Sequence, residues 1–409
     1  MNKRILSLDL IRGVGIMGVV FLHAALYHFA GIFDLDMDNP PLVVTIIGFL
    51  LMWAGLFAII SGFGYAYRLS NRLDEGENKN TFAKGIFFKG AILLILASIY
   101  FVFIGPAIIE FDSRSFLTSM IDGLLMRGQF PSFSFERFVY LDALAMMGWN
   151  LVFLSLMVWL FKPRAENKYK FAKVLLVMGS LIVLSSAVRI PLFEWYENYI
   201  KTGNNFMVWL VSQFINKNNP IIPYIGFGYI GAAFGIFSSG GWQHFKKRFA
   251  YIFGLFWLIT GVTVMFMLPD TMLERTIDWT WYSIMLAQLG IFILIILGTQ
   301  ALVDSPKRES FFRNKMKLIN YFGIISLSIF FLETPLRELY AHLWNGIWPG
   351  WNDTINMTLL FGATLVIIWS GFVYLWKKQE NKGSLEWLLG KFYRGMKVRS
   401  EKAYKIEDQ

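Results

Sequence analysis

Ionisable side chains within an apolar run near the start of the chain are the residues best placed to do chemistry. In the run SLDLIRGVGIMGVVFLHAALYHF, Arg12 and His23 are 11 residues apart. At about 100° per residue they share one face of a helix, about 16 Å apart along its axis. Asp9 lies one turn before Arg12, close enough to pair with it. One face of the predicted helix thus carries an acid, a base and an imidazole.

These residues also have structural interpretations. Asp9 and Arg12 form a purely structural pair if both reach water at a membrane interface. A single His23 in a membrane helix can serve as a hydrogen-bonding contact between helices. Its depth and the face it shares with Arg12 favour a function. His28 lies about 140° round the helix from His23, and we interpret it as a structural or supporting residue that can also face an acceptor.

Two further acids occur within apolar runs. Asp142 opens YLDALAMMGWN, and Glu333 lies within SLSIFFLETPLREL. Ionisable residues in such runs are costly, which makes each one a functional hypothesis. By spacing, both are candidates to line an outward-facing cavity; the alternative is an acid at the interface that faces water. Pro335 is expected to loosen the helix just after Glu333.

The composition predicts what must hold these side chains in place. Of 409 residues 56% are hydrophobic, only 16% are charged, and the mean hydropathy is +0.50. A soluble domain has about 25% charged residues, so too few remain here to cover soluble surfaces. There is no cysteine, which excludes disulfides, thiolate metal sites and thioester acyl-enzymes. We therefore expect a membrane protein, with no metal site.

Ten apolar stretches are long enough for a helix to cross the hydrocarbon core. Their predicted bounds are 8–31, 42–67, 84–108, 138–161, 171–190, 220–239, 249–268, 281–302, 317–340 and 355–376. The sixth is the weakest prediction, being short, rich in glycine and preceded by Pro220 and Pro223. The runs are continuous and so do not fit the alternating strands of a barrel. The expected fold class is an all-α, polytopic transmembrane helix bundle.

The net charge of +10 is explained by topology. With the N-terminus in the cytoplasm, 29 of the 38 lysines and arginines fall in inside segments, and Arg337 is one of eight in outside segments. This bias supports about ten spans with the N- and C-termini cytoplasmic, and it makes a nucleic-acid partner unnecessary. We expect a membrane domain over 1–376 and a basic cytoplasmic tail over 377–409. Two longer outside loops, 109–137 and 191–219, either lie along the interface or cap a cavity.

At these residues the chain resembles the transmembrane acyltransferase superfamily, including heparan-α-glucosaminide N-acetyltransferase-like and acyltransferase-3 proteins. The resemblance is carried by Asp9, Arg12 and Gly13 as an Asp-x-x-Arg-Gly element, by the spacing of Arg12 and His23, and by FAIISGFGYAYR, YLDALAMMGWN and the tail GSLEWLLGKFYR. Lys84 and Lys89 stand where relatives often have arginines, and Glu333 stands where some have a histidine.

The resemblance implies an acyltransferase that moves an acyl group, expected to be acetyl, from cytoplasmic acyl-CoA to a hydroxyl or amine of a glycan, glycolipid or related acceptor. His23 then acts as general base or as transient acyl carrier. Asp9 orients Arg12, and Asp142 is a second base or acceptor-binding candidate. His28 and Glu333 belong to the acceptor side. Candidates to bind the phosphates of coenzyme A are Arg12, Arg68, Lys84 and Lys89.

The expected partners are the lipid bilayer, acyl-CoA and a glycan or lipid-linked acceptor; a homodimer is compatible with the sequence. The expected location is the bacterial cytoplasmic (inner) membrane. The main rival hypothesis is a transporter or flippase, because buried charges and broken helices serve transport equally well. That hypothesis predicts inverted repeats, which the sequence does not visibly contain. A third class is a membrane scaffold or sensor, which predicts that the charges of the first helix tolerate substitution.

Overall fold

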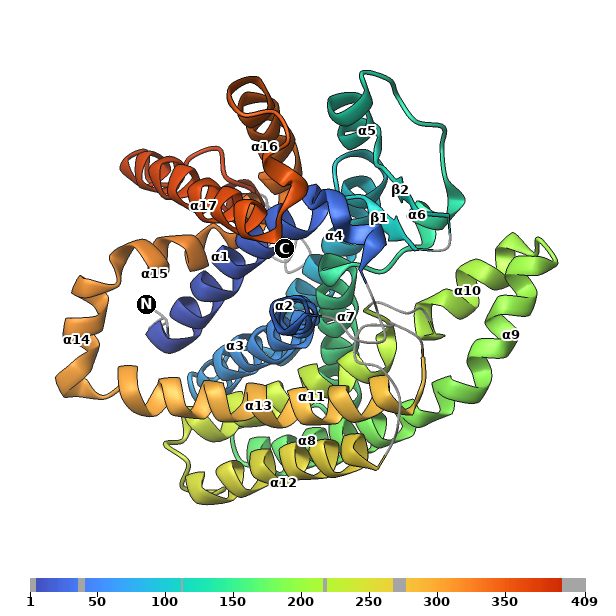
Figure 1. Ribbon diagram of the computed structural model, residues 1–409. Helices are drawn as coiled ribbons and strands as arrows, with labels where there is room; N and C mark the ends of the chain where they lie inside the picture. Colours follow the sequence, from blue (N-terminus) through green and yellow to red (C-terminus); the bar gives the residue numbers. More distant parts are fainter. Residues whose placement is uncertain (1–4, 36–40, 112, 216–218, 268–276, 392–409) are drawn as a thin grey trace, which may run out of the picture. The chain divides into compact units, whose positions relative to one another are not determined.

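The computed structural model describes residues 5–35, 41–111, 113–215, 219–267 and 277–391 (Figure 1). In this part of the chain the fold is almost entirely helical. Its contacts divide it into two compact units. The first unit contains residues 1–8, 34–103 and 131–304; the second contains 9–33, 104–130 and 305–409.

Nine helical stretches among the described residues are long and apolar enough to cross a membrane, or ten when a sharply bent helix pair is one span. This confirms the all-α, polytopic fold class. The helices of these stretches are α1 (Leu6–His28), α2 (Leu42–Leu51) with α3 (Ala54–Asp74), α4 (Lys79–Phe103), α6 (Phe135–Val139) with α7 (Ala143–Phe161), α8 (Lys168–Ser185) with α9 (Arg189–Lys201), α11 (Ile221–Ser239), α12 (Lys247–Phe266), α13 (Trp279–Val303), α15 (Lys317–Ile324) with α16 (Ser326–Ile347), and α17 (Ile355–Lys378).

The first unit is built around α11, the stretch with the weakest sequence prediction. It packs against α3, α7 and α8, while α4 lies along α7 and α12 along α13 (Figure 1). Nearly all of α11 is buried. Its glycines allow this, because a Cβ on Gly231 would lie only 2.2 Å from the carbonyl oxygen of Ile59 of α3, and one on Gly235 only 2.3 Å from that of Phe63. The glycine content that weakened the prediction is thus what lets α11 occupy the centre of the unit.

The second unit is held together by an apolar core between α1, α15, α16 and α17. Its members come from all four helices and from the 3₁₀ turn Trp351–Asp353. Ile16, Val20 and Ala24 contribute one side of α1, with Phe361 and Leu365 of α17 among their partners. Because the spacing of 16, 20 and 24 is one turn, α1 turns one apolar stripe to this core.

The ninth predicted span, 317–340, is not continuous. It consists of α15 and α16, which meet at Ile325 with a bend of 86°. Pro335 lies inside α16 without ending it, and the hydrogen bond that it cannot donate is the local loosening that the sequence predicts. The sharp bend lies ten residues earlier, at Ile325, where the sequence gives no such signal.

Shorter elements lie in the connections. The loop predicted over 109–137 contains an antiparallel hairpin of β1 (Ile108–Glu110) and β2 (Ser115–Leu117), followed by α5 (Met120–Arg127). The loop predicted over 191–219 contains most of α9 and α10 (Asn205–Ile215), which pack together. The remaining elements are α14 (Pro306–Lys315) and the 3₁₀ turns Ala30–Asp34 and Ser186–Val188. Of the predicted tail, 392–409 lies outside the described residues.

Candidate functional site

The acid and the arginine of α1 lie where this helix crosses α15. Arg12 Nη1 is 3.3 Å from Asp9 Oδ1, the pairing that their spacing indicates. A Cβ on Gly13 would lie 2.0 Å from the Ile319 carbonyl oxygen, and one on Gly323 would lie 1.9 Å from the Asp9 carbonyl oxygen. The two backbones therefore touch at this turn, and the glycine after Arg12 is required for that contact.

His23 is paired with a carboxylate from α16. Its Nδ1 lies 3.3 Å from Glu333 Oε2, and its ring packs edge-on against Tyr27 at a centroid distance of 5.5 Å. The histidine side chain is 17% exposed and the glutamate 1%. Glu333 also accepts a hydrogen bond from the hydroxyl of Thr334. The imidazole thus combines a buried anionic partner with partial access.

Arg337 is the centre of the charges on α16. Its Nη1 lies 3.3 Å from Glu333 Oε1, its Nη2 lies 2.9 Å from Glu338 Oε1, and its Nη2 lies 3.6 Å from Asp122 Oδ1. Its guanidinium also stands 4.7 Å from the ring centroid of Tyr27. All four charged side chains are at most 4% exposed. One buried cation therefore binds three buried carboxylates, an arrangement suited to the planar, five-donor guanidinium.

Asp122 reaches this cluster from α5 of the same unit. It lies in the first turn of α5, whose N-terminal Ser119 accepts a hydrogen bond from the Asp122 N–H. Negative charge is favoured at a helix N-terminus. Further along, the His342 ring of α16 hydrogen-bonds the Leu125 carbonyl through Nε2, at 2.6 Å. Two contacts therefore hold α5 against α16.

His28 makes a second histidine–glutamate pair. Its Nε2 lies 3.3 Å from Glu338 Oε1, and its ring packs against Trp351 and Phe361. His23–Glu333 and His28–Glu338 have the same sequence offset of 310. Equal offsets mean that α1 and α16 run parallel at this contact. Arg337 bridges the two glutamates, so both pairs belong to one charge cluster, which we call the α1–α16 cluster: His23, His28, Asp122, Glu333, Arg337 and Glu338.

Three members of this cluster were not predicted from the sequence. Arg337 was counted among the basic residues of the outside segments, whereas the structure buries it within α16. The signal was present, because Glu333 and Arg337 have the i,i+4 spacing of a helical ion pair and lie within the predicted span. Glu338 follows in the same run. Asp122 has no such signal, since its partner is 215 residues away.

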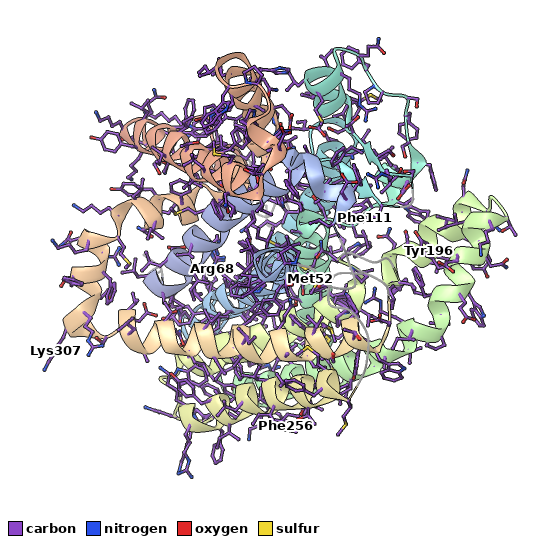
Figure 2. The ribbon with its side chains drawn as sticks, viewed as in Figure 1. Met52, Arg68, Phe111, Tyr196, Phe256 and Lys307 are labelled. Carbon is purple, nitrogen blue, oxygen red and sulfur yellow. The ribbon has the colours of Figure 1, made fainter. Side chains whose placement is uncertain are left out.

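Two of the residues predicted to bind coenzyme A lie together in the first unit. The guanidinium of Arg68, labelled on α3 in Figure 2, is 4.5 Å from the Tyr65 ring centroid, and Lys89 Nζ of α4 is 5.3 Å from it. Arg68 is exposed and Lys89 partly buried. Lys84 is also exposed on α4. We call Tyr65, Arg68 and Lys89 the Tyr65 group.

Asp142 also lies in the first unit, between α6 and α7. It is 5% exposed, and its Oδ1 accepts a hydrogen bond of 2.8 Å from the Ala145 N–H. This contact caps the N-terminus of α7 and gives the carboxylate a structural function. Its role as a second base or acceptor-binding residue stays a prediction.

The described side chains of the α1–α16 cluster are not arranged as metal ligands. Among the residues that the structure describes, no three His, Asp or Glu side chains are arranged to hold a metal ion; the carboxylates converge on Arg337 instead. The arrangement offers proton transfer at His23, oriented by Glu333, which Arg337 holds in turn. This base–orienter geometry is the one that activates a hydroxyl or amine for attack.

Comparison with known proteins identifies the family of the chain. No curated protein matches the chain. The family model of the acyltransferase-3 proteins, described as an acyltransferase domain, matches residues 5–374 and so includes most of each unit and every member of the α1–α16 cluster. A match over nine-tenths of the chain identifies this multi-pass membrane protein as a member of the acyltransferase-3 family.

Proposed function

We propose that this membrane acyltransferase transfers an acyl group, with acetyl as the first candidate, from acyl-CoA to a hydroxyl or amine of a glycan, glycolipid or related acceptor, with His23 as general base. The contact between His23 Nδ1 and Glu333 Oε2 carries the proposal. A carboxylate on Nδ1 favours the tautomer with the proton there, which leaves Nε2 as the acceptor of a second proton.

The steps balance without a further reactant. His23 Nε2 takes the proton of the acceptor O–H or N–H while that oxygen or nitrogen attacks the thioester carbonyl. The new C–O or C–N bond forms, the C–S bond breaks, and the imidazolium returns its proton to the coenzyme A thiolate. Glu333 stabilises the transient imidazolium, and Arg337 holds the Glu333 carboxylate in place.

The cationic residues are the candidates to bind the acyl donor, acyl-CoA. Arg68 and Lys89 of the Tyr65 group are candidates to bind phosphate oxygens of acyl-CoA by charge. Arg12, held by Asp9, and Lys84 stay candidates for the same anion. The lysine and arginine bias supports a cytoplasmic location for both termini. The bacterial inner membrane is the proposed location, with the acceptor reached from the opposite face.

The test uses purified protein and labelled acetyl-CoA. Wild-type protein is expected to bind acetyl-CoA, and cells that express it are expected to contain acetylated lipid or glycan. His23→Ala is expected to bind the donor and to lose transfer by about 100- to 10,000-fold. His244→Ala is the matched control, because His244 is exposed and stacks on Tyr169 in the first unit.

Two results separate the alternatives. Transfer at the wild-type rate by His23→Ala would end the assignment of His23 as the base. A labelled histidine adduct, found by mass spectrometry after incubation with acetyl-CoA alone, would replace general-base catalysis with an acyl-histidine intermediate.

A further inference from the structure

The N-terminus of α16 is capped by a residue from the tail. The first backbone N–H groups of a helix have no partner within it, and Ile325 at the N-cap position has no side-chain acceptor. Glu386, about 60 residues later, fills this role. Its Oε1 accepts hydrogen bonds from the N–H groups of Leu327 at 2.7 Å and Ser328 at 3.3 Å.

The contact is reciprocal. The Ser328 hydroxyl donates to Glu386 Oε2 and accepts a hydrogen bond of 2.8 Å from the Leu385 N–H. Residues 385–391 form a short helix, and its own N-terminus is capped by Ser384, which is fully buried and accepts from the Trp387 N–H. The N-termini of α16 and of the tail helix are thus joined through the side chains of Ser328 and Glu386.

This joint lies on the helix that carries half of the α1–α16 cluster. Ser328 precedes Glu333 by five residues, which is about 7.5 Å along α16. The helix immediately before α16 leaves at 86°, so α15 cannot fix the axial position or rotation of α16 by continuing it. The contacts of Arg337 and His342 hold the later part of α16. The contact with Glu386 holds its beginning.

We propose that Glu386 is a positioning residue for Glu333: by capping α16 it sets the height and rotation at which the Glu333 carboxylate meets His23. The proposal rests on the proposed function for its kinetic consequence. Glu386 contacts none of the reacting atoms of the proposed acyl transfer. Hydrogen bonding to the backbone of the first turn of α16 is the means of positioning. Glutamine keeps the oxygen that accepts from the Leu327 and Ser328 N–H groups and loses only the acceptor for the Ser328 hydroxyl.

A double-mutant cycle tests the link between the two glutamates. Glu386→Ala is expected to lower kcat by about 10- to 100-fold and to leave KM for acetyl-CoA unchanged, whereas Glu386→Gln stays within about twofold of wild type. If Glu386 acts through Glu333, the double variant Glu333→Gln/Glu386→Ala is no slower than Glu333→Gln alone. If the fold-decreases in kcat of the two single variants instead multiply in the double variant, the proposal is overturned.

Hydrogen exchange tests the cap without using activity. Peptides that cover residues 326–333 are expected to exchange faster in Glu386→Ala than in wild type, and at the wild-type rate in Glu386→Gln. The matched control is Glu380→Ala, which removes a charge from an exposed tail residue paired with Lys382. Unchanged exchange in Glu386→Ala would overturn the cap. Ser328→Ala, which removes only the hydroxyl contacts, gives a milder form of the same test if Glu386→Ala does not fold.

The kinetic results separate this proposal from the one on which it rests. A wild-type protein without acyl transfer would refute the proposed function. Intact transfer in the wild type together with an equal kcat in a folded Glu386→Ala variant would overturn the positioning role alone.

Discussion

At the scale of residues, the α1–α16 cluster places four buried charges where none reaches water. Three carboxylates share the guanidinium of Arg337, so the loss of Arg337 removes the one cation that joins them. Partners of this kind are strongly coupled, because removing one leaves the others desolvated and unpaired. The same coupling holds Glu333 against His23. Structural stability and the orientation of the proposed base therefore have a common origin.

Replacing Arg337 tests this dependence. Arg337→Met should lower the free energy of unfolding by about 3–5 kcal/mol, because Glu333, Glu338 and Asp122 lose their shared cation. Thermal unfolding in detergent gives the comparison. The control is Arg313→Met, since Arg313 forms an exposed i,i+4 pair with Glu309 that is worth at most about 1 kcal/mol. Equal stability of the two variants would show that Arg337 is not the centre of the cluster.

The Tyr65 group makes a second prediction at this scale. Arg68→Gln and Lys89→Gln should each raise KM for acetyl-CoA about tenfold, because each removes a charged contact to phosphate, while kcat stays near the wild-type value. Steady-state kinetics separates the two constants. Arg313→Gln removes the same charge from an exposed helix and should change neither. A fall in kcat at constant KM would argue against donor binding by this group.

At the scale of elements, the crossing of α1 and α15 explains why a glycine follows Arg12. The backbones touch at Gly13 and Gly323, which brings the turn that carries Asp9 and Arg12 against α15. The break after α15 then redirects the chain into α16. The segment 317–347 therefore packs beside α1 at two places, first through Gly323 of α15 and then through Glu333 of α16.

A pair of identical substitutions tests the crossing. Gly13→Ala should destabilise the protein by roughly 1–3 kcal/mol, because the new methyl group would lie 2.0 Å from the Ile319 carbonyl oxygen. Gly18→Ala, on the same helix, meets nothing within 4 Å and should be neutral or stabilising by up to about 1 kcal/mol. Thermal unfolding of both variants makes the comparison. Equal stability of the two variants would show that the close contact between Gly13 and Ile319 does not limit the packing of the two helices.

The cap on α16 has a pH dependence. Burial raises the pKa of Glu386 above its ordinary value of 4.5, against the opposite effect of the hydrogen bonds from Ser328 and Leu327. The folded carboxyl therefore keeps its proton at a higher pH than the unfolded one. The Glu386 contribution to the free energy of unfolding is thus full below pH 4.5 and falls as the pH rises from there through the folded pKa.

Glu386→Gln removes this titration. The wild-type protein should lose stability relative to Glu386→Gln as the pH rises from about 4.5 towards neutral. Parallel unfolding curves of the two proteins at several pH values measure the difference. A gain in the relative stability of the wild type over this range would reverse the sign and exclude burial as the dominant effect on Glu386.

At the scale of the whole molecule, the charge asymmetry predicts which side of the membrane each loop faces. The absence of cysteine allows a direct test, because an introduced cysteine is the only thiol in the chain. Ser132→Cys lies in a predicted outside loop and Glu166→Cys in a predicted inside loop, and both positions are exposed. In intact cells a membrane-impermeant thiol reagent should label Ser132→Cys and not Glu166→Cys. The opposite pattern would invert the proposed topology.

The membrane-spanning helices and the residues that share a helix face can be predicted from local sequence signals. Spans such as 355–376 stand out because burial in lipid requires about 20 apolar residues in succession. The Asp9–Arg12 pair and the common face of Arg12 and His23 follow from helix periodicity. The break at Ile325 within the ninth predicted span does not follow from hydropathy. The capping carboxylate of Glu386 stabilises a helix start that hydropathy alone does not reveal.

The sequence by itself determined the class of the protein and most of its helices, because hydropathy and helical spacing act over a few turns. Only the tertiary structure decided which charges meet. His23 with Glu333, Arg337 with Asp122 and Ser328 with Glu386 are contacts between residues 58 to 310 positions apart. Buried charges choose partners by the packing of whole helices, and no local pattern records that choice.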